Sequence, residues 1–260
     1  MNFQILKEKI ELSPVIDFSR ILSDSFDLFK KAWLQGFLLL VLIMASVFFV
    51  QFAAILPFTL FLEGSNFIEP FKQTDFSNFS SLAITIVAAI FIIVVILLLM
   101  TLLVGLLGGF YIVLKNIDLE DTHSTNDFFT LLRTDKFIKT FKVATAQIGI
   151  SIIFILMCYI PIIYATIPIS YIIVIYAFNP ELSVREIIKL AFNFGNKNWV
   201  QTFLLRLIVG FVAMLGIFLC GFGILFTYSL TLIPAYFAYK EVIGFETTDD
   251  IDEIGSIDTY

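Results

Sequence analysis

The chain has 260 residues, of which 59% are hydrophobic and only 15% are charged, and its formal net charge is −6. Soluble domains hold roughly 45–50% apolar and about 25% charged residues. This composition, with a mean hydropathy of +0.97, excludes a soluble globular protein and predicts an integral membrane protein.

The first predicted element is an amphipathic helix over residues 14–32. Its apolar side chains recur at helical spacing and its charged side chains take the opposite face, which is typical of a helix lying on a membrane surface. Lys30 and Lys31 come just before Trp33, so we expect the ammonium groups among lipid phosphates and the indole at headgroup depth. A membrane span over residues 34–56 follows.

Further along the chain, three more long stretches are free of charge apart from Arg206. About 20 apolar residues cross a bilayer. The last two stretches are longer than one crossing and contain Pro161, Pro168 and the segment "CGFG" at 220–223, so each is divided into a hairpin. The solid apolar runs lack the alternation of a barrel strand. The prediction is an all-α polytopic membrane protein with about six transmembrane helices, at residues 34–56, 82–107, 143–159, 162–178, 200–220 and 224–239.

Two capping-box spacings predict where the other two surface helices begin. Ser124 precedes Asp127, and Ser183 precedes Glu186, each three residues apart and ahead of an apolar run. Three amphipathic surface helices are therefore expected on the cytoplasmic side. The segment "WLQGFLL" at 33–39 returns as "WVQTFLL" at 199–205, which indicates that the junction between surface helix and span is written twice.

The distribution of positive charge predicts the orientation. Fourteen of the sixteen Lys and Arg residues lie in the segments assigned to one side and only Lys72 lies on the other, and cytoplasmic segments hold the excess of positive charge. Both termini are expected in the cytoplasm, in a multi-pass protein of the inner (cytoplasmic) membrane. Residues 1–240 form one helical domain, and residues 241–260 form an acidic, disordered tail.

Arg206 is the one ionisable residue inside a predicted span. It follows Trp199 by seven residues, which puts it about 10 Å deep at 1.5 Å per residue. It is either an anchor whose guanidinium snorkels to the surface or a specific site for an anion or lipid headgroup. The lipid-headgroup candidates together are Arg206, Trp199, Lys197, Trp33, Lys30 and Lys31.

Three glycines have spacings that favour close helix packing. Gly105 and Gly109 are four residues apart, and Gly216 precedes Cys220 by the same distance. Small residues at this spacing let helices approach closely in a membrane.

No catalytic constellation is visible in the sequence. His123 is the single histidine, so metal chemistry on several imidazoles, such as a carotenoid oxygenase requires, is disfavoured. The predicted spans hold no carboxylate that would act as base or couple transport to ions. We expect no cofactor, no metal and no enzymatic activity.

Several segments together resemble a known group of proteins. They are "DFSRILSDSFDLFKKAW" at 17–33, the Pro-bearing hairpin from Ile160, "KNW" at 197–199 and "GFGILFTYSLTLIPAYFAYKEV" at 221–242. The chain resembles six-span bacterial membrane proteins related to the membrane domain of glycerophosphodiester phosphodiesterases. The resemblance implies a fold and topology, and no agreed activity.

These observations predict a non-catalytic membrane module that interacts with lipids or with partner proteins. An uncoupled small-molecule permease or channel is one alternative, and a membrane enzyme acting on lipid headgroups is a second. Membrane lipids are the expected partners, protein partners or a homo-oligomer stay open, and no nucleic acid is expected.

Overall fold

The computed structural model describes residues 2–64, 79–119, 124–157, 159–216 and 223–245. Every regular element in these residues is helical. The helices are α1 (Phe3–Leu12), α2 (Phe18–Gly64), α4 (Phe79–Leu119), η1 (Thr125–Phe129), α5 (Thr134–Leu156), α6 (Tyr159–Phe178), α7 (Val184–Lys197), α8 (Trp199–Leu215), α9 (Ile224–Thr227), η3 (Tyr228–Thr231) and α10 (Ile233–Val242).

Among the described residues, four helices are long and apolar enough to cross a membrane. They contain the stretches Phe18–Ala54, Ile86–Leu119, Thr134–Leu156 and Pro161–Phe178, and α7 with α8 makes a fifth if the bent pair is one span. The protein is therefore an all-α polytopic membrane protein, as its composition predicts.

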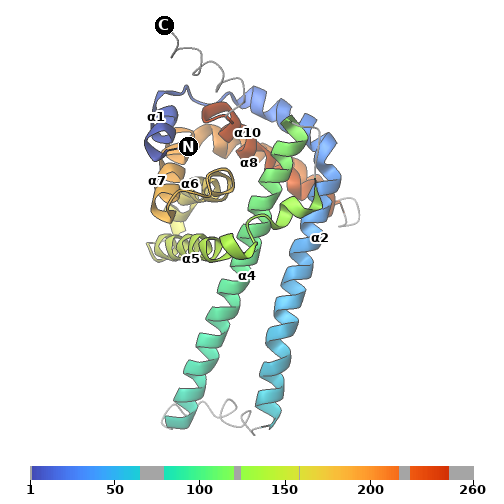
Figure 1. Cartoon of the computed structure of the whole chain (residues 1–260), viewed down its shortest axis with the longest axis vertical. Coiled ribbons are helices and arrows are strands. Elements are labelled where there is room, and N and C mark those ends of the chain that lie inside the picture. The colour runs from blue at the N-terminus through green and yellow to red at the C-terminus, as the bar shows by residue number, and fades with distance from the viewer. Residues whose placement is uncertain (1, 65–78, 120–123, 158, 217–222, 246–260) are drawn as a thin grey trace.

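Two long helices and a compact group of shorter ones make up the molecule (Figure 1). Helices α2 and α4 run side by side along its length, and α1, η1 and α5 to α10 gather around one end of this pair. We call this group, with the parts of α2 and α4 that it covers, the body. The core of the body holds large, fully buried rings, including Phe110, Phe128, Tyr171, Phe194 and Tyr236.

The first surface helix and the first span are one helix. The structure runs without a break from Phe18 to Gly64, whereas the sequence predicted a surface helix over 14–32 and a separate span over 34–56. No proline or capping residue interrupts the chain at Trp33, and Ala32 and Leu34 favour a helix. At its start, the Asp17 carboxylate accepts from the backbone N–H groups of Ser19 (2.9 Å) and Arg20 (3.1 Å), which caps the helix.

The two capping boxes form as the sequence predicts. The Ser124 hydroxyl and the Asp127 carboxylate close the box of η1, and the Ser183 hydroxyl and the Glu186 carboxylate close that of α7. Hydrogen bonds from the hydroxyl and the backbone N–H of Ser183 lower the pKa of Glu186. The middle surface helix differs from the prediction, because after η1 the chain enters α5 at Thr134 and continues as one helix to Leu156.

Helices α7 and α8 reproduce the predicted order of a surface helix followed by an apolar one. They meet at Asn198 with a bend of 83°. The Asn198 side chain is fully buried, and its oxygen accepts from the backbone N–H of Ile16 (3.2 Å) while its nitrogen donates to the carbonyl of Phe194 (3.2 Å). A residue that bonds both to the preceding helix and to a remote segment fixes the bend in place.

The last predicted span, 224–239, is wrong as a single helix. Helix α9, η3 and α10 occupy it as three short pieces. Pro234 stands in the first turn of α10, where its missing N–H and fixed φ are tolerated at a helix start but not in an interior. The span predicted at 200–220 corresponds to α8 up to Leu215, and residues 217–222 lie outside the described residues.

The helical domain extends beyond the predicted boundary at residue 240. Val242 and Ile243 are buried, and the Phe245 ring lies with its centroid 4.8 Å from that of Phe178. Gly244 ends α10 with a positive φ of 73°, a conformation that glycine adopts without strain. Residues 246–260 of the predicted tail lie outside the described residues.

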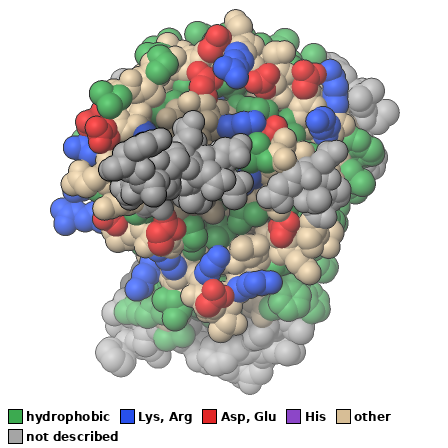
Figure 2. Space-filling model, turned by 45° about the horizontal axis from the view of Figure 1, so that its top comes forward, with side chains coloured by type: hydrophobic (Ala, Val, Ile, Leu, Met, Phe, Trp, Pro, Cys, Tyr) green, Lys and Arg blue, Asp and Glu red, His purple; other side chains and the backbone are tan. Residues whose placement is uncertain are grey.

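Charged side chains gather on the end of the body away from the free ends of α2 and α4. Figure 2, in which this end comes forward, shows Lys, Arg, Asp and Glu side chains over it. Here the Asp118 carboxylate accepts from the Lys240 ammonium (2.6 Å) and from the Tyr236 hydroxyl (2.7 Å). This polar end is the part of the surface suited to water.

Candidate functional site

Helix α8 has an outer face and an inner face, although both are mainly apolar. The outer face is exposed at Val200, Leu204, Leu207, Phe211 and Met214, and the inner face is buried at Thr202, Leu205, Val209 and Ala213. Arg206 follows Thr202 by four residues and precedes Val209 by three, so its side chain starts from the inner face. The arginine is half-buried.

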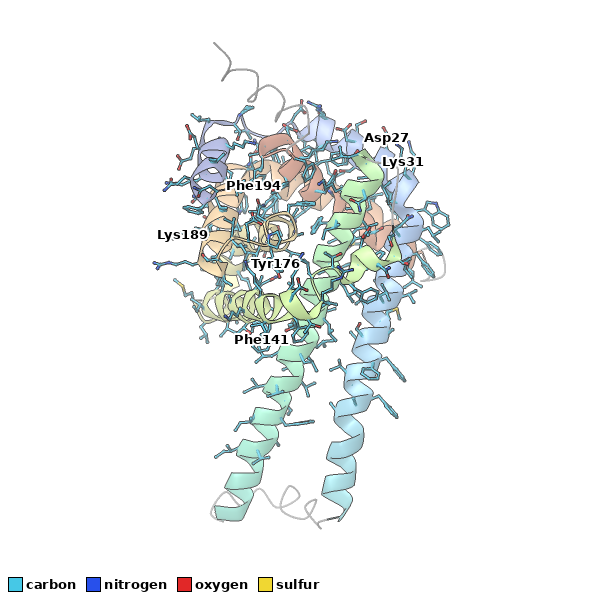
Figure 3. All side chains as sticks on the ribbon, in the orientation of Figure 1. Asp27, Lys31, Phe141, Tyr176, Lys189 and Phe194 are labelled. Carbon is cyan, nitrogen blue, oxygen red and sulfur yellow. The ribbon has the colours of Figure 1, made fainter. Side chains whose placement is uncertain are left out.

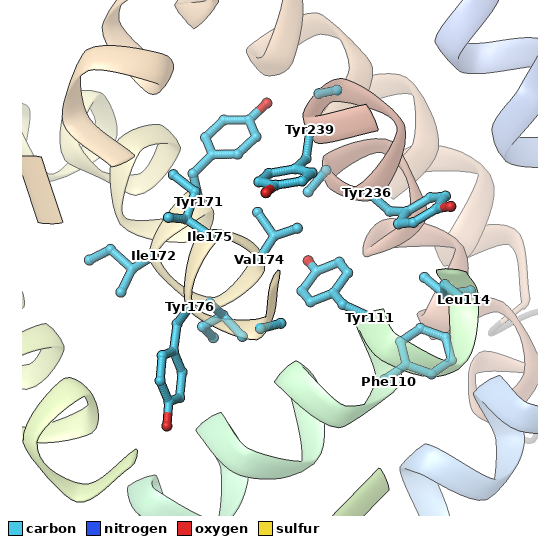
Figure 4. Packing of buried hydrophobic residues seen from close by; sticks show 14 of the residues in the cluster. Phe110, Tyr111, Leu114, Tyr171, Ile172, Val174, Ile175, Tyr176, Tyr236 and Tyr239 are labelled. Atoms are coloured by element: carbon cyan, nitrogen blue, oxygen red, sulfur yellow. The ribbon is translucent and has the colours of Figure 1, made fainter. Parts of the chain in front are cut away.

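Two buried tyrosines, Tyr111 of α4 and Tyr171 of α6, lie within electrostatic range of Arg206. The Tyr171 hydroxyl also shares a hydrogen bond of 2.7 Å with the Thr202 hydroxyl, one turn before the arginine. Figure 4 shows Tyr111 and Tyr171 in the interior of the body, on separate helices. We call Arg206, Thr202, Tyr111 and Tyr171 the Arg206 cluster.

The Arg206 cluster is rich in hydrogen-bond donors and lacks a carboxylate. No ion pair among the described residues includes Arg206. Guanidinium offers five N–H donors in a fixed fork, and tyrosine and threonine hydroxyls donate or accept as required. Such a set matches an anion with several oxygens, above all phosphate or carboxylate, which arginine binds bidentately.

Arg206 starts from the inner face of α8 and is half-buried. The snorkelling anchor and the specific anion site both stay predictions, because the long arginine side chain reaches well beyond the turn that carries it. The sequence did not single out Tyr111, Tyr171 or Thr202, because each is one hydroxyl in an apolar run and no spacing connects the three helices.

Lys197, a lipid-headgroup candidate, forms hydrogen bonds within the protein. Its ammonium donates to the carbonyls of Ile10 (2.6 Å) and Glu11 (2.9 Å) and also to that of Ser13. These are the carbonyls at the C-terminal end of α1, where a cation is favourable because the helix leaves them unsatisfied. Lys197 therefore attaches α1 to α7.

Trp199, a second candidate, also serves the fold. Pro168 lies inside α6 and has no N–H to donate to the carbonyl of Tyr164, four residues earlier. The Trp199 indole N–H donates to this carbonyl at 3.0 Å. The ring stacks on Phe203 with a centroid distance of 5.2 Å. The indole thus replaces a backbone hydrogen bond that the proline removes.

The remaining lipid-headgroup candidates, Lys30, Lys31 and Trp33, belong to α2 and are remote from Arg206 in the sequence. Figure 3 labels Lys31 near the charged end of the body. Lys30 pairs with Asp27 at 2.8 Å, and both side chains are mostly exposed. Lys31 is exposed, and Trp33 is 45% exposed beside Phe226. Residues of this kind on the outside of a helix stay available to lipid or water.

The glycines pack closely, but not all against another long helix. A Cβ on Gly105 would lie 2.2 Å from the Leu132 side chain, and one on Gly109 would lie 2.2 Å from the Phe128 carbonyl oxygen, so both face the η1 segment. A Cβ on Gly216 would lie 2.8 Å from the Gly223 carbonyl carbon. The Gly216 approach holds the end of α8 against the start of α9.

Within the described ranges, no group of three or more His, Cys, Asp or Glu side chains is placed to hold a metal ion. His123 and the "CGFG" cysteine lie outside these ranges. The chain matches no known protein family, no curated protein and no solved structure.

Proposed function

We propose that the protein is a non-catalytic integral membrane protein that holds an anionic lipid headgroup at the Arg206 cluster. The observation that carries the proposal is the half-buried Arg206, which starts from the inner face of α8, lies within electrostatic range of two buried tyrosines and has no ion pair among the described residues. A half-buried guanidinium without a counter-charge is costly in an apolar setting. A bound anion would offset this cost.

The chemistry of the cluster favours binding over catalysis. Its other members supply hydroxyl groups, and the pKa of a free tyrosine is about 10, so none of them is a general base at neutral pH. A lipid is favoured over a soluble anion because the outer face of α8 is apolar and exposed, so acyl chains would lie beside the helix that carries Arg206.

The cellular setting is part of the same proposal. The excess of Lys and Arg in segments on one side supports both termini in the cytoplasm. The bacterial inner membrane rests on the resemblance to the membrane domain of glycerophosphodiester phosphodiesterases, which stays a prediction about fold and topology and carries no argument for a ligand. No observation favours the permease or the headgroup enzyme over this function.

Lipid retention by the purified protein tests the proposal. Native mass spectrometry would compare phosphatidylglycerol with zwitterionic phosphatidylethanolamine for the wild type, Arg206→Leu and Arg206→Lys. We expect preferential retention of the anionic lipid by the wild type, partial retention by Arg206→Lys and loss by Arg206→Leu. Arg185→Leu is the matched control, because Arg185 is an exposed arginine on the neighbouring helix α7.

Two further arms separate the possible outcomes. Tyr171→Phe keeps the ring and removes the hydroxyl that bonds Thr202, so we expect weaker retention with an intact fold. Excess inorganic phosphate should not displace the lipid; displacement would show a site for a soluble anion. Equal retention by the wild type and Arg206→Leu would refute the headgroup site, and steady product formation from the bound lipid would refute the non-catalytic function.

A further inference from the structure

Helices α2 and α4 continue far beyond the body. In α4 no described side chain from 86 to 100 is buried, and burial begins at Thr101. In α2, Leu42 and Ile43 still pack against the core of the body, and only Val50 is buried between 44 and 54. Figure 1 shows the two helices projecting alone from the body. We call residues 44–64 and 79–100 the free hairpin.

The free hairpin has the length of one bilayer. Residues 44–62 and 79–100 contain no charged residue, and the first charge after the α2 stretch is Glu63. At 1.5 Å per residue the two uncharged stretches measure about 29 Å and about 33 Å. The hydrocarbon core of a bilayer is about 30 Å thick. The free hairpin is therefore long enough to cross the membrane by itself.

The other candidate spans run in a different direction. In Figure 1, α5 and α6 lie across the long axis that α2 and α4 follow. Both helices qualify as spans by length and composition alone. If α2 and α4 follow the membrane normal, α5 and α6 lie along the membrane plane and do not cross.

Helix α5 presents an apolar surface to the side of the free hairpin. Figure 3 places Phe141 on this side of α5. Ile138 is 66% exposed, Ile152 is 49% exposed and Leu156 is 79% exposed. The exposed Lys142 follows Phe141. Large exposed apolar residues beside a lysine are typical of a helix that lies in the membrane interface.

We propose that the free hairpin alone crosses the bilayer and that α5 lies in the cytoplasmic interface, with its exposed apolar residues among the upper acyl chains. The body then rests on one leaflet with its charged end toward water. The proposal does not rest on the Arg206 cluster, and it places that cluster in the body on one leaflet and not within a span. It places 15 of the 16 Lys and Arg residues on the body side, Arg206 included, and only Lys72 beyond the hairpin. The six-span prediction separates 14 from one and leaves Arg206 within a span. The proposal also differs in placing the C-terminal ends of α5 and α8 on the cytoplasmic side.

Depth measurements on spin labels distinguish the two arrangements. The full chain with Cys158→Ala and Cys220→Ala would carry one label at a time, from Ile138→Cys or Ile152→Cys, in vesicles of phosphatidylethanolamine and phosphatidylglycerol. A helix that crosses the bilayer separates these positions by about 21 Å in depth. We expect a difference below about 5 Å, with both labels near the headgroups. Met44→Cys and Phe52→Cys on the hairpin are the control and should differ by about 12 Å.

Chemical access from outside gives a second measurement that does not depend on spin-label depth. Leu156→Cys stands at the end of α5, which a crossing helix would bring to the outer surface. We expect no reaction of this cysteine with a membrane-impermeant maleimide added to cells, while Gly64→Cys at the end of α2 reacts. Labelling of Leu156→Cys from outside, or a large depth difference between the two α5 labels, would overturn the proposal.

Discussion

The contact between α4 and η1 predicts that Gly109→Ala destabilises the fold. A Cβ at this position would lie 2.2 Å from the carbonyl oxygen, 2.5 Å from the carbonyl carbon and 2.7 Å from the Cα of Phe128. All three are backbone atoms, so no side-chain rotation relieves the overlap. The capping box of η1 holds this segment, and the Asn116 amide of α4 donates to Asp127 at 2.9 Å.

The size of the effect follows from two opposing contributions. Overpacking costs typically 1–3 kcal/mol, and an immovable backbone favours the upper end of this range. Replacing glycine by alanine inside a helix recovers about 1 kcal/mol of helix propensity. We expect Gly109→Ala to lower the free energy of unfolding by about 2 kcal/mol. For a chain of this size this corresponds to a melting temperature lower by roughly 5 °C.

Gly149→Ala is the matched control. Gly149 lies inside α5 and has no atom within 4 Å of an added Cβ, so only the propensity gain applies and stability should hold or rise. Thermal unfolding of both variants in one detergent, followed by fluorescence, gives the comparison. A Gly109→Ala protein that melts with the wild type would show that η1 does not pack on α4 as described.

Three other contacts give predictions of the same kind. Trp199→Phe keeps an aromatic ring but loses the indole N–H, so the Tyr164 carbonyl is left unpaired and the free energy of unfolding should fall by about 1–2 kcal/mol. Trp33→Phe is the control and should change stability little. Equal melting temperatures for the two variants would contradict this prediction. Lys197→Met should speed proteolysis within α1, and Lys189→Met on the same helix should not; unchanged cleavage of the first variant would exclude the predicted attachment. Ser183→Ala should cost about 1 kcal/mol and speed hydrogen exchange in the first turn of α7, and unaltered exchange there would show that the cap is not needed.

Local signals in the sequence predict local features well. The boxes at Ser124 and Ser183 form because a hydroxyl and a carboxylate three residues apart need only each other and the intervening backbone. A change from an amphipathic to an apolar pattern likewise indicates the boundary between two helices before Trp199. The continuous helix α2 was missed because the same change of pattern occurs at Trp33 without a break in the backbone. A change of pattern therefore marks a change of environment, and only a cap or a missing N–H ends the helix.

The candidate site was harder to predict than the fold for a physical reason. Hydrophobic periodicity identifies the inner face of a helix when the outer face is polar. Helix α8 is apolar on both faces, so the sequence contains no signal for the direction of Arg206. The partners Tyr111 and Tyr171 come from helices remote in the chain, and only the packing of α4, α6 and α8 brings them together.

The repeated segment shows how one pattern serves two different packing sites. At matching positions, Leu34 and Val200 are both exposed, and Leu39 and Leu205 are both buried, so the two copies present the same faces. The copies differ on the inner face at one position, Gly36 in the first and Thr202 in the second.

This one difference determines the neighbour of each copy. Ser229 of η3 approaches Gly36 so closely that an added Cβ would lie 2.0 Å from its hydroxyl oxygen. Thr202 instead fills the corresponding space and bonds the Tyr171 hydroxyl of the Arg206 cluster at 2.7 Å. The shared residues set which side of each helix faces inward, because they repeat at helical spacing. The residue that is not shared selects close backbone packing in α2 and a polar contact in α8, and in this way the second copy contributes to the candidate site.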